Sequence, residues 1–326
     1  MVIIATLIAK GRLQRDGLFK IADRLEDARF KAHEWSWIDE GDAADIEIQC
    51  GPDKIPQLYA LLDGVLEATD IVLQPAAGRE KRMFVADMDS TMVAQECIDE
   101  LADFAGKKAE IAAITEAAMR GDLDFTTALK QRVKALNGLG FATVEKCRVE
   151  RIRRNPGAMT LVRTMKARGA ATLLVTGGFH DFAGPLASEL GFDEVRANYL
   201  ESAHGRLTGR TAGKLVDATA KRQALIDLRD RLGIPASAVI AVGDGANDAP
   251  MIEEAGLGIA YYGKPKLRAV ADARIDHGDL TALLWAQGIP KREWVGGEAI
   301  PDYPFTGKQA WPDRPAQVAD AAARVE

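Results

Sequence analysis

The stretch RMFVADMDSTMV, residues 82–93, decides the fold. It begins with an apolar run of strand-like residues and turns polar at once, with carboxylates at Asp87 and Asp89. A continuous apolar run without alternation is typical of a parallel strand that helices cover on both faces. Because the active sites of such sheets gather at the carboxyl ends of their strands, this stretch predicts an α/β fold with functional groups directly after the strand.

Two later stretches repeat this pattern of an apolar run that ends in a polar turn. They are ATLLVTGG, Ala171–Gly178, and AVIAVGDG, Ala238–Gly245, with one more candidate strand at Gly258–Tyr261. Thr176 and Asp244 stand at the ends of the first two. Since neighbouring parallel strands end at one edge of a sheet, we expect both side chains to meet the aspartates of the first strand.

The chain divides by pattern into four parts. Residues 82–288 read as the parallel α/β core, and a helix-rich insertion at about 92–154 is far longer than an ordinary βα connection, which predicts a helical cap. Residues 1–76 read as a separate α+β domain, and 77–81 as a linker. Residues 289–326, rich in proline and glycine, predict an irregular tail that packs partly through its tryptophans, Trp294 and Trp311 among them.

The first 76 residues alternate strand-like and helical patterns in the order β-α-β-β-α-β. This is the ferredoxin-like arrangement. The expected strands are Val2–Ala9, His33–Asp39, Ala44–Gln49 and Asp70–Leu73, and the expected helices are Gly17–Leu25 and Pro56–Ala68. None of these segments carries a nucleophile or a ligand cluster, so we expect this domain to bind, regulate or dimerise rather than to catalyse.

Composition excludes several classes of protein. Hydrophobic residues make up 47% of the 326 residues and charged residues 28%, which is ordinary globular usage. With 42 Lys and Arg against 48 Asp and Glu, the net charge of −6 disfavours nucleic acid as a partner. No apolar run is long enough to span a bilayer, and three scattered cysteines form no disulfide framework. We therefore expect a cytoplasmic protein with no membrane partner.

Four elements suggest phosphate chemistry only when they are taken together. The paired carboxylates Asp87 and Asp89 could equally cap a helix, and the VTGG turn could be a plain tight turn. Lys221 lies in a helical pattern over 214–232, where most lysines are solvated. Asp244 and Asp248, on a glycine-containing turn, suit a hard cation, and without an EF-hand pattern magnesium is favoured over calcium.

The four elements in this order resemble the motifs of the haloacid dehalogenase superfamily. The sequence DMDSTMVAQECIDELA, Asp87–Ala102, further resembles the nucleophile motif of its phosphoserine phosphatase family. The stretches Ala117–Val133, VTGGF, GDGANDAPM and Lys264–Asp272 also fit that family. The resemblance implies a Rossmann-like core with an inserted cap, preceded by an ACT-like domain.

The resemblance also implies a role for each matching residue. Asp87 would attack phosphorus, and Asp89 would act as general acid and base. Magnesium would be held by the Asp87 carboxylate, the Asp89 backbone carbonyl and Asp244, with Asp248 in support. Glu96 would bind the substrate ammonium and Arg132 its carboxylate. The full set of implied substrate-binding residues is Glu96, Met119, Phe125, Arg132, Thr176, Gly177, Lys221 and Asn247.

The implied activity is hydrolysis of O-phospho-L-serine to L-serine and phosphate, the last step of serine biosynthesis. A related small-molecule phosphatase, or a phosphotransferase that passes the phosphoryl group to another alcohol, would use the same residues. An amino-acid sensor that has lost activity is a third reading, although all the aspartates and the lysine of the motifs are present. The ACT-like domain implies a homodimer.

Overall fold

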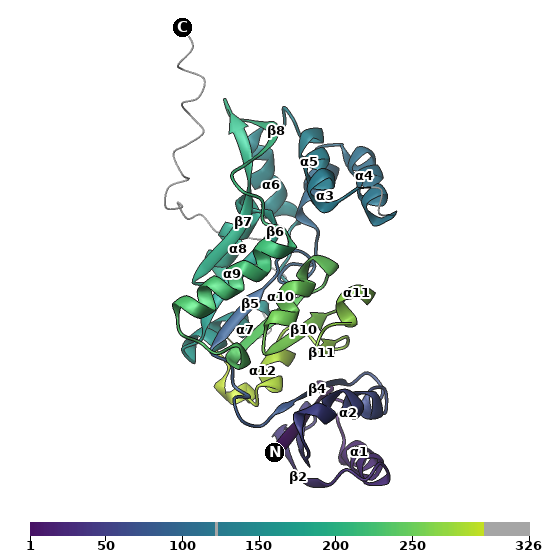
Figure 1. Ribbon diagram of the computed structural model, residues 1–326. Coiled ribbons are helices and arrows are strands. Elements are labelled where there is room, and N and C mark those ends of the chain that lie inside the picture. The colour runs from purple at the N-terminus through teal and green to yellow at the C-terminus, as the bar shows by residue number, and fades with distance from the viewer. Residues whose placement is uncertain (121–122, 297–326) are drawn as a thin grey trace.

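The computed structural model describes residues 1–120 and 123–296, and within these ranges nothing is described of the side chains at 33, 116–120 and 125. Figure 1 shows a core sheet with the N-terminal sheet at one end and a group of helices at the other. Two sheets account for the named strands, one of four strands and one of seven. The division into the predicted domains stays a prediction, although each sheet has helices of its own.

The N-terminal sheet has the strand order β2-β3-β1-β4 and is antiparallel throughout. Its elements are β1 (Val2–Ile8), α1 (Arg15–Asp27), β2 (Ala32–Asp39), β3 (Ala43–Gln49), α2 (Ile55–Leu62) and β4 (Asp70–Pro75), with a 3₁₀ turn at Pro52–Lys54. This is the β-α-β-β-α-β order that the sequence predicts. The second helix ends at Leu62 rather than Ala68, because Gly64 and Ala68 adopt positive φ angles of 74° and 47° that a right-handed helix cannot contain.

The core sheet has the order β11-β10-β9-β5-β6-β7-β8, parallel from β11 to β7, with β8 antiparallel to β7. Its strands are β5 (Met83–Ala86), β6 (Ala171–Phe179), β7 (Glu194–Ala203), β8 (Arg206–Ala212), β9 (Val239–Gly243), β10 (Leu257–Tyr261) and β11 (Ala273–Ile275). Every residue of β5, β9 and β10 is buried, as expected for strands covered on both faces. The sequence analysis did not predict β7, β8 or β11.

The helices of the core follow their strands in the usual alternation. They are α7 (Ala158–Ala167), α8 (His180–Leu190), α9 (Ala218–Arg231), α10 (Ala249–Glu254), α11 (Pro265–Arg268) and α12 (Ala282–Ala286), with 3₁₀ turns at Ala236–Ala238, Ala246–Asp248 and Lys291–Glu293. Helix α9 begins later than the predicted pattern over 214–232, because the Asp217 carboxylate accepts a hydrogen bond from the backbone N–H of Ala220, 2.8 Å away, and so caps the helix.

The predicted cap is a group of four helices between β5 and α7. They are α3 (Cys97–Phe104), α4 (Lys108–Arg120), α5 (Phe125–Ala135) and α6 (Phe141–Arg151). Asp124 caps α5 by accepting a hydrogen bond from the N–H of Thr127, 3.0 Å away. The cap lies at the end of the core opposite to the N-terminal sheet, as Figure 1 shows.

The N-terminal sheet is joined to the core by a half-buried arginine of the predicted linker. The Arg79 guanidinium pairs with both carboxylate oxygens of Asp45 and donates to Thr6 Oγ1, 2.8 Å away. It also donates to the backbone carbonyls of Trp285 and Ala286 at 3.1 and 2.9 Å. Because a guanidinium offers five donors in one plane, a single side chain ties the N-terminal sheet to helix α12 of the core.

The predicted tail is described only as far as residue 296. Trp294 packs against Trp285, with ring centroids 4.9 Å apart, as the sequence led us to expect of the tail's start. Trp311 and residues 297–326 lie outside the described residues. Among the described helices, none is both long and apolar enough to cross a membrane.

Candidate active site

The carboxyl ends of β5 and β9 bring three predicted residues into one cluster. Asp87 follows β5, and Asp244 and Asp248 follow β9. Their carboxylate oxygens lie within 4.8 Å of one another, and all three side chains are buried. Carboxylate oxygens in a group of this size are suited to a hard divalent cation.

Lys221 reaches this cluster from helix α9. Its ammonium lies 2.7 Å from Asp87 Oδ1 and 2.6 Å from Asp248 Oδ1, and its side chain is only 1% exposed. Burial alone would lower the pKa of Lys221, but the carboxylates of Asp248 and Asp87 raise it above that of an ordinary lysine. Lys221 is therefore a permanently charged cation fixed beside the predicted nucleophile.

The hydrogen bonds of Asp248 differ from those of Asp87. Both oxygens of Asp248 are engaged, Oδ1 with Lys221 and Oδ2 with the backbone N–H groups of Asp244 and Gly245, at 3.2 and 3.0 Å. Asp87 Oδ1 accepts from the N–H of Met88, 2.7 Å away, and from Lys221. Asp248 thus shapes the turn that carries Asp244, while Asp87 and Asp244 line the adjoining cavity.

Asp89 is half-buried and lies beside Cys97 and Glu96. Its Oδ1 accepts a hydrogen bond from the backbone N–H of Cys97, 3.1 Å away. Burial, followed by the neighbouring Glu96 carboxylate, raises the pKa of Asp89 to about 7. A carboxyl group with a pKa near neutrality can both give and take a proton, which suits a general acid and base.

The predicted turn at VTGG is the last part of strand β6, which continues to Phe179 with a shift in its register against β7. This part of the strand holds the predicted phosphate-binding residues Thr176 and Gly177. Thr176 Oγ1 accepts a hydrogen bond from the N–H of Gly178, 2.8 Å away. A Cβ atom at Gly178 would lie 2.8 Å from both Asp89 Oδ2 and Met88 Cε, so a larger residue there would displace the Asp89 carboxylate. Asn198 of β7, which sequence reasoning missed, donates to the carbonyl of Gly177 at 2.8 Å and so fixes the turn.

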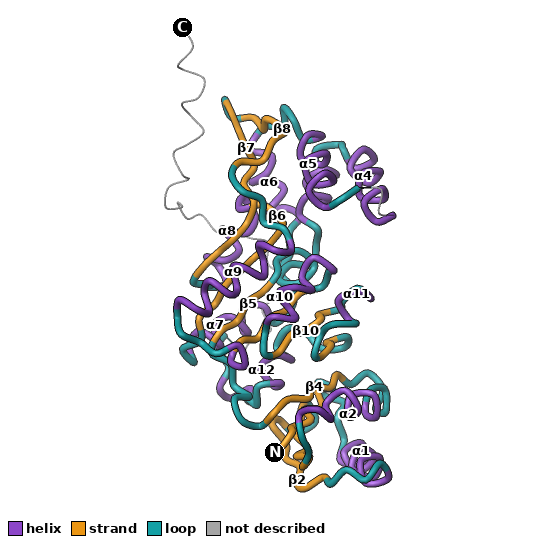
Figure 2. The backbone as a smooth tube through the Cα atoms, in the orientation of Figure 1, coloured by secondary structure: helices purple, strands orange, loops and turns teal. Residues whose placement is uncertain are grey.

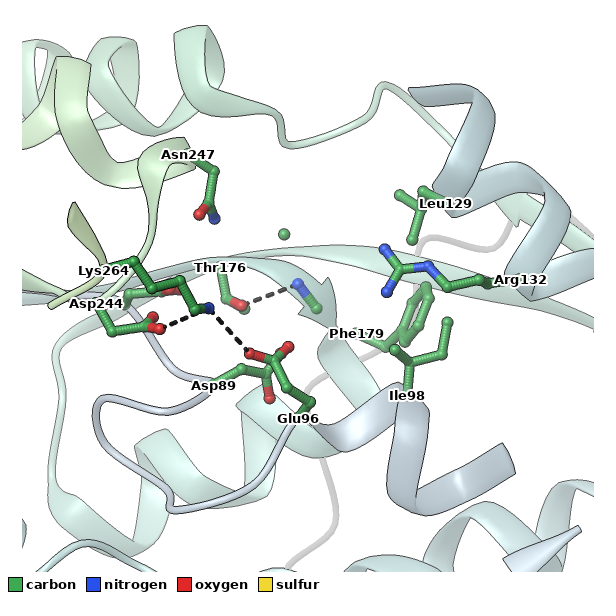
Figure 3. Close-up of a pocket in the computed structure, with 13 residues that line it drawn as sticks. Asp89, Glu96, Ile98, Leu129, Arg132, Thr176, Phe179, Asp244, Asn247 and Lys264 are labelled. Atoms are coloured by element: carbon green, nitrogen blue, oxygen red, sulfur yellow. Dashed lines mark hydrogen bonds and ion pairs between the residues drawn. The ribbon is translucent and has the colours of Figure 1, made fainter. Parts of the chain in front are cut away.

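These groups border a cavity of about 190 Å³ between the strand ends and the cap. Figure 3 shows Arg132 and Leu129 projecting from α5 on one side, with Asp244, Asn247 and Lys264 on the other. The lining residues are Asp87, Asp89, Glu96, Ile98, Leu129, Arg132, Thr176, Gly177, Gly178, Phe179, Asp244, Asn247 and Lys264. Cationic side chains therefore lie on both sides of the cavity, Arg132 on one and Lys264 beside Asp244 on the other.

Most of the predicted substrate-binding residues lie at this cavity. Glu96, Arg132, Thr176, Gly177 and Asn247 line it directly, and Lys221 lies behind the carboxylate cluster. The side chains of Met119 and Phe125, predicted as the apolar wall of the cap, lie outside what the structure describes. The described apolar wall consists of Ile98, Leu129 and Phe179.

Lys264 is a lining residue to which the sequence analysis gave no role. Its ammonium lies 3.0 Å from Asp244 Oδ2 and 4.0 Å from Glu96 Oε1. Ser90 holds the same Glu96 oxygen through a hydroxyl hydrogen bond of 3.0 Å. The signal that could have identified Lys264 is its position shortly after β10, at the same edge of the sheet as the other site residues.

The parallel core, the helical cap and the buried carboxylate–lysine cluster at the strand ends together define an enzyme-like site in an α/β fold. The model of the haloacid dehalogenase-like hydrolase family matches residues 84–253. The chain belongs to this family. The chain is therefore an enzyme rather than an inactive sensor. The relatives described next indicate that this enzyme is a phosphatase.

Curated proteins similar to this chain include phosphoserine phosphatases. The one from Polaromonas sp. is 47% identical over 208 residues, which cover 62% of this chain and 88% of that protein. A solved structure described as a phospho-aspartyl intermediate analogue of phosphoserine phosphatase is 38% identical, with a TM-score of 0.59 over 63% of this chain and 98% of the other.

A third similarity extends beyond the core. The crystal structure of a haloacid dehalogenase family hydrolase from Salmonella enterica serovar Typhi is 30% identical, with a TM-score of 0.75. The similarity covers 88% of this chain and 98% of the other chain. The covered part of this chain is longer than the core of residues 82–288, so it includes residues outside the core. The N-terminal sheet therefore belongs to an arrangement that another member of the family also has.

Proposed function

We propose that the chain is a phosphoserine phosphatase that hydrolyses O-phospho-L-serine to L-serine and phosphate. One observation carries the proposal: a cavity of about 190 Å³ is lined by the Asp87, Asp89 and Asp244 carboxyl groups and by a second group, Glu96 and Arg132. The first group matches the needs of a phosphate ester. The second matches the ammonium and the carboxylate of an amino acid.

In the first half of the proposed reaction, a carboxylate oxygen of Asp87 forms a bond to phosphorus. The bond between phosphorus and the serine oxygen breaks, and Asp89 gives its proton to that oxygen. An aspartyl-phosphate on Asp87 and free serine result. Lys221, held 2.7 Å from Asp87 Oδ1, offsets the negative charge that gathers there.

In the second half, water attacks phosphorus while Asp89, now ionised, takes a proton from it. The bond between phosphorus and the Asp87 oxygen breaks, which releases phosphate and restores the carboxylate. A pKa near 7 allows Asp89 to alternate between the two roles. The backbone amides of the turn at Thr176 and Gly177 would bind the phosphoryl oxygens throughout.

The same cluster fits magnesium. Asp87 and Asp244 would hold the ion with the Asp89 backbone carbonyl, and Asp248 would support them, since its own oxygens are already engaged. A bound Mg²⁺ would offset charge as an anionic nucleophile approaches an anionic ester. The oxygen-only donor set favours Mg²⁺ over softer ions.

Phosphate release from O-phospho-L-serine, compared with a panel of phosphate monoesters and with EDTA, tests this function. We expect phosphoserine to be preferred and EDTA to abolish turnover. Equal rates for all monoesters would contradict the assignment of Glu96 and Arg132. Adding homoserine separates hydrolase from phosphotransferase, because transfer forms phosphohomoserine at the expense of free phosphate.

We further propose a cytoplasmic homodimer that pairs through the N-terminal domain of residues 1–76. Cys50, Cys97 and Cys147 are free thiols, as is usual in a reducing compartment. Strand β2 is an edge of the N-terminal sheet, with β3 as its one neighbour in the described sheet, and an edge strand can pair with a second copy. Sedimentation of the full chain tests the dimer; a monomer at all concentrations contradicts it.

A further inference from the structure

The antiparallel pair β7 and β8 extends from the core toward the cap. Tyr199 pairs with Ala212 near its base and Ala203 with Arg206 at its tip. Figure 2 shows both strands running past the end of the parallel sheet to reach helices α5 and α6. The proposed reaction gives this hairpin no role. It nevertheless contacts strand β6 and helix α5, and both of these elements supply residues that line the cavity.

At its base, the hairpin holds the phosphate-binding turn. Asn198 of β7 is 1% exposed, and its amide donates to the Gly177 carbonyl at 2.8 Å. The Asn198 side-chain oxygen accepts from the N–H of Val216 at the same distance. With both ends of its amide bonded, Asn198 fixes Gly177 relative to β7.

At its tip, the hairpin forms a short ladder with the segment that follows α5. Leu207 donates its N–H to the Leu139 carbonyl and accepts from the N–H of Gly138, both at 2.8 Å. Phe141 donates to the Gly205 carbonyl, also at 2.8 Å. The Leu207 side chain is 2% exposed and belongs to the same apolar core as the buried residues of α5. The cap is thus tied to the core sheet at this point.

Gly209 makes the closest approach between the hairpin and α5. It has a φ of +74°, and a Cβ atom there would lie 2.9 Å from Asn137 Cβ and 3.3 Å from both Cα and the carbonyl oxygen of Lys134. Because two of these atoms are backbone, α5 would have to shift to accept a side chain. Arg132 lies on the same helix, just before Lys134, and lines the cavity.

We propose that the β7–β8 hairpin is a strut that sets the separation between the phosphate-binding turn and Arg132, with Gly209 as a positioning residue. The strut makes the cavity selective for phosphate esters that carry a carboxylate at the distance found in phosphoserine. This inference rests on the proposed function, in which Arg132 binds that carboxylate. It adds that the backbone of a distant strand, rather than the cap alone, places the guanidinium.

The test compares Gly209→Val with Gly213→Val in the full chain. Gly213 has a φ of +77°, so it suffers the same backbone strain, but a Cβ atom there meets nothing within 4 Å. We expect Gly209→Val to raise KM for phosphoserine about tenfold while kcat changes little. KM for phosphoethanolamine, which lacks the carboxylate, should stay within about twofold. Equal shifts in both variants, or for both substrates, would overturn the strut.

Arg132→Ala separates this inference from the proposed function. If Arg132→Ala raises KM for phosphoserine alone and Gly209→Val does not, the strut fails and the function stands. If Arg132→Ala affects both substrates equally, the assigned function of the cap side fails. Should Gly209→Val not fold, Leu207→Ala removes the apolar anchor without backbone strain, and the absence of the same KM shift would overturn the strut equally.

Discussion

The strand-end side of the cavity and its cap side are built in different ways. On the strand-end side, the side chains of Lys221 and Asp248 are 1% and 0% exposed and bonded to each other. On the cap side, Glu96 is 43% exposed and Arg132 is half-buried. The groups proposed to handle phosphate are therefore held by buried ion pairs, whereas the groups proposed to select the substrate are more accessible.

This comparison predicts that substitutions at the strand ends abolish turnover, while substitutions at the cap change substrate affinity. Asp87→Asn should have the largest effect, a fall in kcat of about 10⁴-fold or more, because it removes the attacking oxygen. Single-turnover assays with phosphoserine measure it. An unchanged melting temperature would show that the variant is folded. Turnover close to that of the unaltered chain would show that Asp87 is not the nucleophile.

Lys221→Met should come next. It leaves the Asp87 and Asp248 carboxylates facing each other without their shared cation. We expect kcat/KM to fall about 10³-fold and the free energy of unfolding to drop by about 3 kcal/mol. Urea denaturation measures the second effect. The exposed Lys266→Met serves as the control, and similar stability losses in both variants would contradict a buried ion-pair cluster.

Glu96→Gln tests the cap side with a smaller expected effect. We expect KM for phosphoserine to rise about tenfold with little change in kcat, since Glu96 pairs with the substrate ammonium. With 3-phosphoglycerate, which carries a hydroxyl in place of the ammonium, the variant and the unaltered chain should differ little. A fall in kcat instead would indicate that Glu96 takes part in the reaction with the strand-end residues rather than in substrate binding.

The smallest effect concerns Asp89, which lies between the two sides. Burial, followed by the charge of Glu96, raises the pKa of Asp89 to about 7 in the folded chain. Between about pH 4 and pH 7 the folded state therefore holds a proton on Asp89 that the unfolded state has released. Stability should therefore fall as the pH rises through this window. In EDTA, Asp89→Asn should reduce that slope; an identical slope in both chains would contradict the raised pKa.

The sequence was sufficient to predict the strand-end residues because the rule that places them is local. A buried parallel strand ends, and the next residues lie at the site, which is how Asp87, Thr176 and Asp244 are found. Contacts between distant segments carry no such signal. Asn198 lies where β7 pairs with β6, and Gly209 packs against α5. Both contacts join segments that are far apart in the sequence, so the local pattern did not predict the hairpin.

Lys264 shows the same limit in a milder form. Its place shortly after β10 follows the strand-end rule, but its partners Asp244 and Glu96 come from two other segments. The end of α2 at Leu62 was mispredicted for a local reason. A helical apolar pattern continues past Gly64, but the backbone already leaves the helix at Asp63, with a ψ of 128°, and Gly64 and Ala68 then adopt positive φ angles.

The most direct test of the central claim is mass spectrometry of the chain after acid quenching during turnover of O-phospho-L-serine. The proposed reaction predicts a phosphoryl group on the peptide that contains Asp87, which accumulates while substrate lasts and is absent from Asp87→Asn. Turnover at a normal rate with no phosphoryl group on Asp87, or with the group on another residue, would contradict it.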